Sequence, residues 1–316
     1  MTLSALKPFG IVIVVALCAA LLPFIAGPYG LALAINMAMY VALCTAWVLF
    51  SGPTGYASLA TVAFFGLGMY IMAIFAETLP WFAILPITLA LSGLAALIVG
   101  GATLRLTGVH FVIFTFGLAE LVRQLVTWEE TTFAGNVGRY VFVDTSQAQI
   151  YWQLVGLSAA LFCLGSWLQT RRAGWALRAI GADETAARHM GINTTRVKLI
   201  VFVLSAMAMA LVGMIMAPRW TYIDPTIAFS PVVSFQVLIM CLLGGTGRLW
   251  GPLLGVIPLV LVTEILQANM PTYFSVFLGA IFLVTVYLLP GGVVGLVERL
   301  HGSRRNAPDS VEEVRV

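Results

Sequence analysis

The chain has 316 residues, of which 61% are hydrophobic and only 9% are charged, with a mean hydropathy of +1.01. This composition excludes a soluble globular domain and predicts an all-α polytopic membrane protein, a single transmembrane domain over residues 1–316. The formal net charge of +3 gives no indication of nucleic-acid binding, because the charged residues are divided between the two sides of the membrane.

Apolar runs that end at charged residues or at Gly and Pro predict about ten transmembrane helices. They cover residues 9–26, 30–50, 58–75, 82–103, 109–127, 151–169, 198–217, 231–243, 252–267 and 274–289. The first run could also be a cleaved signal peptide, but no convincing small-residue cleavage site follows it. The eighth run has only 13 residues, which leaves open whether it is a complete span or a re-entrant or broken helix.

The basic residues orient these spans. With both termini in the cytoplasm, the inner segments carry thirteen of the sixteen Lys and Arg residues, and the outer segments carry only Arg139 and Arg219. This bias predicts an N-in, C-in topology. Ten spans divide into two halves of five that run in opposite senses, which permits an inverted repeat of five-helix halves, although the halves show no convincing sequence similarity. We expect the polar tail, residues 301–316, to be disordered and cytoplasmic.

The start of the third span, at Gly52, Pro53 and Gly55, predicts irregular backbone. In a membrane such backbone is tolerated where it is buried in protein or lines a cavity, and a broken helix indicates a transport pathway. The candidate substrate-pathway residues are Asn36, Ser58, Thr61, Phe65 and Thr115. We expect Ser58, Thr61 and Phe65 to share a helical face, where small hydroxyls beside an aromatic ring suit an amphiphile better than a bare ion. Helix packing through small residues is the alternative.

Two charged residues, Glu120 and Arg123, lie within the fifth span, and we place them near its outer end. Their i, i+3 spacing lets them pair, which lowers the cost of placing charge in a membrane. We therefore expect a structural ion pair rather than a substrate site. The longest external loop, residues 128–150, follows this span, and it is either a solvated connection or a surface where an external partner lands.

The central loop, residues 170–198, is strongly charged, with six basic and two acidic residues that mark it as cytoplasmic. Within it, Asp183 suits a helix N-cap, Glu184 suits the positive first turn, and Gly191 suits the left-handed residue after the last turn. The helix between them, Glu184–Met190, is too short to be stable alone and must lean on another surface.

Small side chains line one face of this short helix, because Ala186, Ala187 and Met190 share it by their i, i+3, i+4 spacing. A face of this kind lets another protein approach closely, so we predict a docking helix for a cytoplasmic partner. The predicted coupling residues are Asp183, Glu184, Ala186, Ala187, Met190 and Gly191. The alternative is a solvated loop that only satisfies the positive-inside rule.

The usual signatures of chemistry are absent from the sequence. It has no Gly-x-x-x-x-Gly-Lys-Ser/Thr run, since neither Lys7 nor Lys198 follows a glycine, so we expect no ATP hydrolysis by this chain. The histidines His110, His189 and His301 lack the spacing of metal ligands. We expect no catalytic residue, no metal and no cofactor in this chain.

Two stretches resemble a known family. Glu184-Thr-Ala186-Ala187-x-x-x-Gly191 resembles the EAA loop of ATP-binding-cassette (ABC) import permeases. The glycine-rich turn Gly244-Gly245-x-Gly247-x-x-x-Gly251-Pro252-x-x-Gly255 resembles the signature of LivM-type permeases of branched-chain amino acid importers. The run from residue 55 to residue 70 is also similar, although Tyr56, Ala57, Ala60 and Thr61 replace the family's Gln, Leu, Gly and His. The resemblance covers residues 30–300.

This resemblance implies a permease that forms one half of the membrane channel of an importer in the bacterial inner membrane. The implied partners are a second homologous permease, two cytoplasmic ATPase subunits that use the ATP, and an extracytoplasmic substrate-binding protein. The implied substrate is a branched-chain or related hydrophobic amino acid, moved inward by alternating access. Urea, short amides and aromatic acids are the alternative substrates.

Other functional classes have less support from the residues. A stand-alone secondary carrier or channel needs ionisable residues at mid-membrane that face a cavity, and none is convincingly central. A membrane scaffold without a transport role leaves the polar pathway candidates unexplained, and an intramembrane enzyme lacks a catalytic set of residues.

Overall fold

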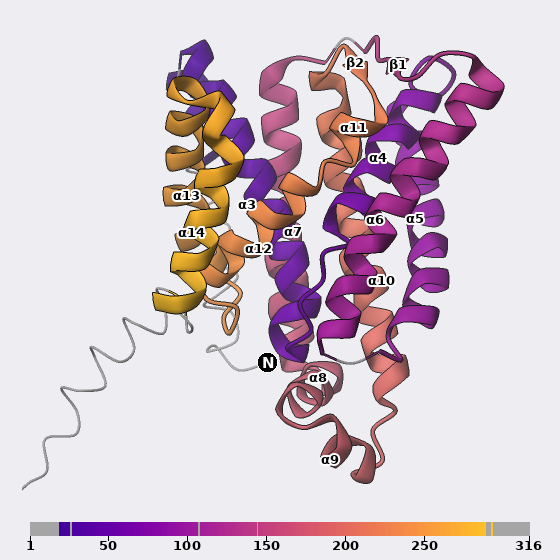
Figure 1. The fold of residues 1–316 in the computed structure, drawn as a ribbon, viewed down its shortest axis with the longest axis vertical. Coiled ribbons are helices and arrows are strands. Elements are labelled where there is room, and N and C mark those ends of the chain that lie inside the picture. Colours follow the sequence, from indigo (N-terminus) through magenta and orange to yellow (C-terminus); the bar gives the residue numbers. More distant parts are fainter. Residues whose placement is uncertain (1–18, 26, 107, 144, 289–291, 293–316) are drawn as a thin grey trace, which may run out of the picture.

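The computed structural model describes residues 19–25, 27–106, 108–143, 145–288 and 292. These residues form a bundle of long helices, with a two-stranded ribbon at one end and two shorter helices at the other (Figure 1). The all-α polytopic class is confirmed. Most of the predicted first span, residues 9–26, and the predicted tail, residues 301–316, lie outside the described residues.

Nine of the predicted spans correspond to a helix in the described part of the chain. They are α3 (Pro28–Thr54), α4 (Thr61–Phe75), α5 (Trp81–Thr103), α6 (Val109–Glu129), α7 (Gln147–Thr170), α10 (Thr194–Met216), α12 (Pro231–Gly244), α13 (Gly251–Asn269) and α14 (Phe274–Leu288). Within the described residues, seven stretches are long and apolar enough to cross a membrane, while Thr61–Phe75 and Pro271–Thr285 are shorter apolar helices. The count of ten spans and the N-in, C-in orientation stay predictions.

The eighth predicted span is a broken helix. The one-turn helix α11 (Pro225–Ala228) precedes α12, and Phe229 and Ser230 separate the two. Pro231 has no backbone N–H with which to continue the hydrogen bonds of α11, but it suits the first residue of a new helix. Together the two helices give a 20-residue apolar stretch, Pro225–Gly244, which is long enough to cross the membrane.

Helix α10 lies at the centre of the bundle and packs against α3, α4 and α5. Its contact with α4 is made by backbone: a Cβ atom at Gly68 would lie 1.9 Å from the carbonyl oxygen of Ala210. A Cβ atom at Gly213 would likewise lie 1.9 Å from the carbonyl oxygen of Phe65. Only glycine permits this approach, which is the small-residue packing common between membrane helices.

The irregular backbone predicted before the third span is confirmed, but the span begins later than predicted. Gly55 ends α3 in the left-handed conformation, with φ of 72°, and α4 begins only at Thr61. Ser58 therefore precedes the helix. The predicted helical face shared by Ser58, Thr61 and Phe65 is wrong, because i, i+3 spacing places residues on one face only within a continuous helix.

Side chains from other helices hold this irregular segment. Trp47 Nε1 donates a hydrogen bond to the carbonyl oxygen of Ser58 at 2.7 Å, and the amide of Leu59 donates to Thr115 Oγ1 at 3.1 Å. Ser234 Oγ donates to the carbonyl oxygen of Leu59 at 3.0 Å. These bonds replace those that a helix would make within itself, which is the condition for non-helical backbone in a membrane.

At the outer end, two external loops are joined by strands β1 (Arg139–Tyr140) and β2 (Tyr222–Ile223), which pair antiparallel. The external connection is shorter than the predicted loop over residues 128–150. Helix α6 continues into a π-helical segment, η1 (Glu130–Ala134), and α7 begins at Gln147 behind a capping box formed by Ser146 and Gln149. Residues at both ends of the predicted loop therefore belong to helices, because they take part in the hydrogen bonds of the helix ends.

At the opposite end, the predicted central loop consists of two helices, α8 (Arg172–Ala182) and α9 (Glu184–His189), which lie below the long helices (Figure 1). Helix α8 is an addition to the predicted elements. It packs against α3, α7, α9 and α10, so this short charged helix is part of the folded body rather than a free loop.

Candidate functional site

The short helix α9 is built as its sequence predicts. The Asp183 carboxylate caps it, with Oδ1 accepting from the amides of Thr185 at 2.8 Å and Ala186 at 3.1 Å. Gly191 follows it with a left-handed φ of 82°. The helix has six residues and ends at His189, one residue earlier than predicted. A helix of this length depends on contacts with the rest of the protein.

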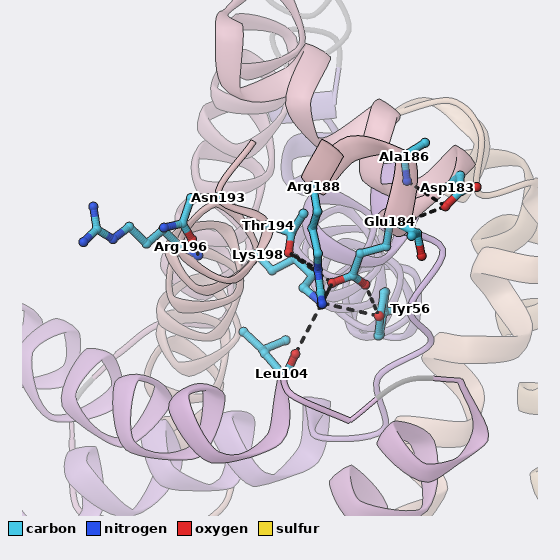
Figure 2. A network of polar contacts seen from close by, with 11 residues as sticks. Tyr56, Leu104, Asp183, Glu184, Ala186, Arg188, Asn193, Thr194, Arg196 and Lys198 are labelled. Carbon is cyan, nitrogen blue, oxygen red and sulfur yellow. Dashed lines mark hydrogen bonds and ion pairs between the residues drawn. The ribbon is translucent and has the colours of Figure 1, made fainter. Parts of the chain in front are cut away.

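Those contacts converge on the Glu184 carboxylate, which points toward the bundle (Figure 2). Its Oε1 atom accepts hydrogen bonds from Arg188 at 2.7 Å, Lys198 Nζ at 2.9 Å and Thr194 Oγ1 at 3.1 Å. Its Oε2 atom accepts from the Tyr56 hydroxyl at 2.5 Å. We call these five side chains the Glu184 network. It joins α9 to the start of α10 and to the irregular segment before α4.

Lys198 is the buried cation of the network, with no solvent exposure. Besides its ion pair with Glu184, Nζ donates to the carbonyl oxygen of Leu104 at 3.3 Å, just after α5, and to the Tyr56 hydroxyl at 3.3 Å. Nζ also lies 4.5 Å from the centre of the Tyr56 ring. A buried ammonium is tolerated only when it is paired and hydrogen-bonded, and Lys198 meets both conditions.

The network fixes the charge of Glu184. Burial raises the pKa of this carboxyl, but hydrogen bonds from Tyr56, Lys198 and Arg188 outweigh burial and lower the pKa to about 2. Burial and the hydrogen bond to Glu184 raise the pKa of Tyr56, so its hydroxyl stays protonated and remains a donor. At neutral pH Glu184 is therefore an ionised carboxylate.

The predicted docking face of α9 requires a correction. Ala187 is fully buried, whereas Ala186 is exposed and Met190 is 67% exposed. The side of α9 that carries Ala187 packs against the permease body, because α9 contacts both α8 and α10. Ala187 therefore offers no surface to a partner in this structure. Of the six predicted coupling residues, Asp183, Ala186, Met190 and Gly191 are exposed.

The five predicted pathway residues do not come together. Asn36 and Phe65 line one cavity of about 190 Å³, and Ser58 lines a separate one of about 10 Å³. Thr61 and Thr115 are buried and line neither of these cavities. Thr115 instead holds the backbone of Leu59. For Ser58, Thr61 and Thr115, the structure favours the packing alternative.

The predicted ion pair between Glu120 and Arg123 is present. Arg123 Nε donates to Glu120 Oε2 at 2.9 Å, and a second guanidinium nitrogen contacts Oε1. The predicted position near the outer end of the span is wrong. Since α6 runs from Val109 to Glu129 and continues into η1, Glu120 lies near the middle of the helix. The pairing was readable from the spacing, but the length of the helix was not.

Sequence reasoning missed the partners of Glu184. The i, i+4 pair of Glu184 and Arg188 follows a spacing that supports ion pairs on a helix, and could have been read from the sequence. Lys198 gave a weaker signal, as a lone charge at the start of an apolar span. Tyr56 gave none, because it lies 128 residues from Glu184 along the chain.

Comparison with known proteins agrees with this architecture. A family described as the branched-chain amino acid transport system permease component matches residues 29–286. The chain belongs to this permease family. The permease is therefore a multi-pass protein of the inner membrane and a transport subunit of the ABC importer class.

Individual relatives are also permeases. The permease is 26% identical to the high-affinity branched-chain amino acid transport system permease protein LivM of Salmonella typhimurium, over 86% of this chain and 71% of that protein. The Escherichia coli LivM protein is 26% identical over 77% of this chain and 64% of its own length. The autoinducer 2 import system permease protein LsrC of Klebsiella pneumoniae is 29% identical over 43% of this chain and 41% of its own. No solved structure matches the permease.

Proposed function

We propose that the permease is one of two membrane subunits of a binding-protein-dependent ABC importer that moves branched-chain or related hydrophobic amino acids inward. Its partners are a second homologous permease, two cytoplasmic ATPase subunits that consume the ATP, and an extracytoplasmic binding protein. Membership of the family and the names of the relatives support the transport role. Alternating access moves the substrate, and no covalent chemistry takes place in this chain.

The observation that carries the proposal is the Glu184 network. It links α9 to the start of α10, the end of α5 and the segment before α4 through short polar contacts around one buried ion pair. A displacement of α9 therefore pulls on three elements of the bundle at once. Packed protein interiors transmit such displacements because they resist compression. In the proposed cycle, the ATPases move α9 and the network passes this movement to the spans.

The surface for the ATPases is the exposed side of α9. Ala186 and Met190 lie on it, four residues apart, and Met190 is a flexible apolar side chain of the kind used at adaptable contacts. Arg188 adds positive charge in the last turn of the helix. Glu184 and Ala187 lie on the buried side. One side of this short helix therefore faces the permease body, and the other side faces the proposed ATPase.

The test is Met190→Arg, which places a charge in the proposed contact and leaves the buried side of α9 unchanged. We expect uptake of radiolabelled leucine and the amount of co-purified ATPase to fall at least tenfold, with the permease still inserted in the membrane. Thr132→Arg, an exposed position at the outer end, is the matched control and should have no effect. Normal uptake by Met190→Arg would refute the docking surface. Parallel uptake of urea and of benzoate by the unaltered importer separates the substrate alternatives.

A further inference from the structure

A cavity of about 190 Å³ lies among α3, α4, α12, α13 and the segment that precedes α12. Asn36 belongs to the first half of α3 and Glu264 to the second half of α13. These halves of the two helices lie toward the end of the bundle opposite α9 (Figure 1). The volume is more than ten times the roughly 10–15 Å³ that one water molecule needs. The cavity therefore has room for a small molecule.

Glu264 lines this cavity, and Arg219, which is not itself a lining residue, is hydrogen-bonded to the wall residue Asn36; the two opposite charges form no ion pair with each other. Arg219 is partly buried, and its Nη1 atom donates to the Asn36 amide oxygen at 3.0 Å, an uncharged acceptor on the cavity wall. Glu264 is a partly buried wall residue that attracts Arg219 electrostatically. Among the described residues, Glu264 has no hydrogen bond and no ion pair within 4.0 Å.

This arrangement leaves two charges that a ligand can satisfy. Partly buried charges are unfavourable unless they are paired, so a charged group that enters the cavity gains from both. The guanidinium of Arg219 matches the two oxygens of a carboxylate. Glu264 is a suitable acceptor for an ammonium group. A molecule that carries the two groups on neighbouring atoms bridges Arg219 and Glu264 at the same time.

The rest of the wall selects for an apolar remainder. Met39, Phe65, Met69 and Val260 line the cavity beside the polar group formed by Tyr40 and Gln236. Small-molecule sites typically combine mostly apolar walls with a few convergent polar groups. The lining of the cavity thus combines the charged Glu264 and several polar groups with an apolar wall.

We propose that this cavity is a binding site for an amino acid zwitterion, with Arg219 holding the carboxylate, Glu264 holding the ammonium group, and the apolar wall receiving the side chain. The inference rests on the proposed import function and adds the site and the residues that determine specificity. Asn36 is a positioning residue, because its amide oxygen orients the Arg219 guanidinium.

The site is tested in the assembled importer by protection of a cysteine. Gln267 is exposed and lines the cavity, so Gln267→Cys in a background without native cysteines should react with a membrane-impermeant maleimide. We expect L-leucine to slow this reaction. Leucinol, which lacks the carboxylate, and 4-methylpentanoate, which lacks the amino group, should not slow it at the same concentration. Glu77→Cys, on an exposed external loop, is the control position and should show no protection.

Charge variants then assign the two roles. Arg219→Gln and Glu264→Gln should each raise the leucine concentration for half-maximal protection at least tenfold, while Glu77→Gln leaves it unchanged. The charge-conserving variants Arg219→Lys and Glu264→Asp should require leucine concentrations between those of the neutral variants and that of the unaltered importer. They also serve as the test if the neutral variants lower the yield of the assembled complex. Equal protection in all variants would overturn the site. Leucine uptake without protection would also overturn it but would leave the import function standing, whereas no leucine uptake by the unaltered importer would overturn the proposed substrate.

Discussion

Two sites, one at each end of the permease, differ in how their charged side chains are satisfied. At the inner end, Glu184 accepts hydrogen bonds from four side chains, and Lys198 has no exposed surface. At the outer end, Glu264 lines a cavity, and Arg219 bonds to the neutral Asn36 on the wall of that cavity. By a closed pair we mean two charged side chains in direct contact, which form a rigid connection. Where opposite charges do not contact each other, both can still interact with a ligand. We therefore propose that the inner pair transmits force and that the outer cavity binds a ligand.

Position in the membrane does not by itself explain this difference, because the outer end also contains a closed pair. Glu130 is 1% exposed and accepts from the amide of Gly138 at 2.8 Å, and its Oε1 atom lies 3.3 Å from Arg139 Nε. These contacts tie strand β1 to the end of α6. Within the part of the chain that the structure describes, the lack of an ion pair between Arg219 and Glu264 is thus a local feature of this region.

The largest expected effect comes from breaking the inner pair. Lys198→Met leaves the Glu184 carboxylate without its buried cation, which should cost about 3–5 kcal/mol of stability and abolish uptake. The double variant Lys198→Met, Glu184→Gln removes both charges and should regain much of the stability. The measurement is the thermal unfolding of the purified permease together with leucine uptake. A double variant as unstable as the single one would show that the ion pair is not the source of the stability.

An intermediate effect is expected from the closed pair at the outer end. Arg139→Gln removes the cation beside the buried Glu130 but leaves the Gly138 hydrogen bond, so about 1–3 kcal/mol should be lost. The loosened β1 segment should also increase the labelling of a cysteine at Val141, which is buried in the intact ribbon region. Arg171→Gln, an exposed arginine at the inner end, is the control. Unchanged labelling in Arg139→Gln would show that this ion pair does not hold the β1 segment in place.

The smallest expected effect is that of pH near neutrality. Since the folded protein lowers the pKa of Glu184 from 4.5 to about 2, the stability that this carboxylate contributes is fully present above pH 4.5. It is lost only as the pH falls toward 2. The difference in unfolding temperature between the unaltered permease and Glu184→Gln should therefore be constant from pH 5 to 8 and shrink below 4.5. A difference that changes between pH 5 and 8 would mean that Glu184 is not held as its contacts indicate.

Local patterns in the sequence determined where the helices lie, how some of them are capped, and which side chains one helical turn apart form pairs. Hydrophobic runs located nine described spans, Asp183 and Gly191 marked the ends of the helix near Glu184, and Glu120 and Arg123 paired at i, i+3 as their spacing indicates. These features were predictable because they depend on hydrogen bonds and contacts between residues at most four positions apart.

The tertiary structure alone decided what each of these elements faces. Ala187 became buried and Met190 exposed on the same short helix, because α8 and α10 cover one side of it. Glu184 meets Tyr56 across 128 residues, and Arg219 meets Asn36 across 183. No periodicity encodes such partners, since the side chains that meet across a bundle depend on how whole helices cross and where each one begins and ends. The sequence therefore determines which charges the membrane must accommodate, and the packing determines which of these charges form ion pairs with each other.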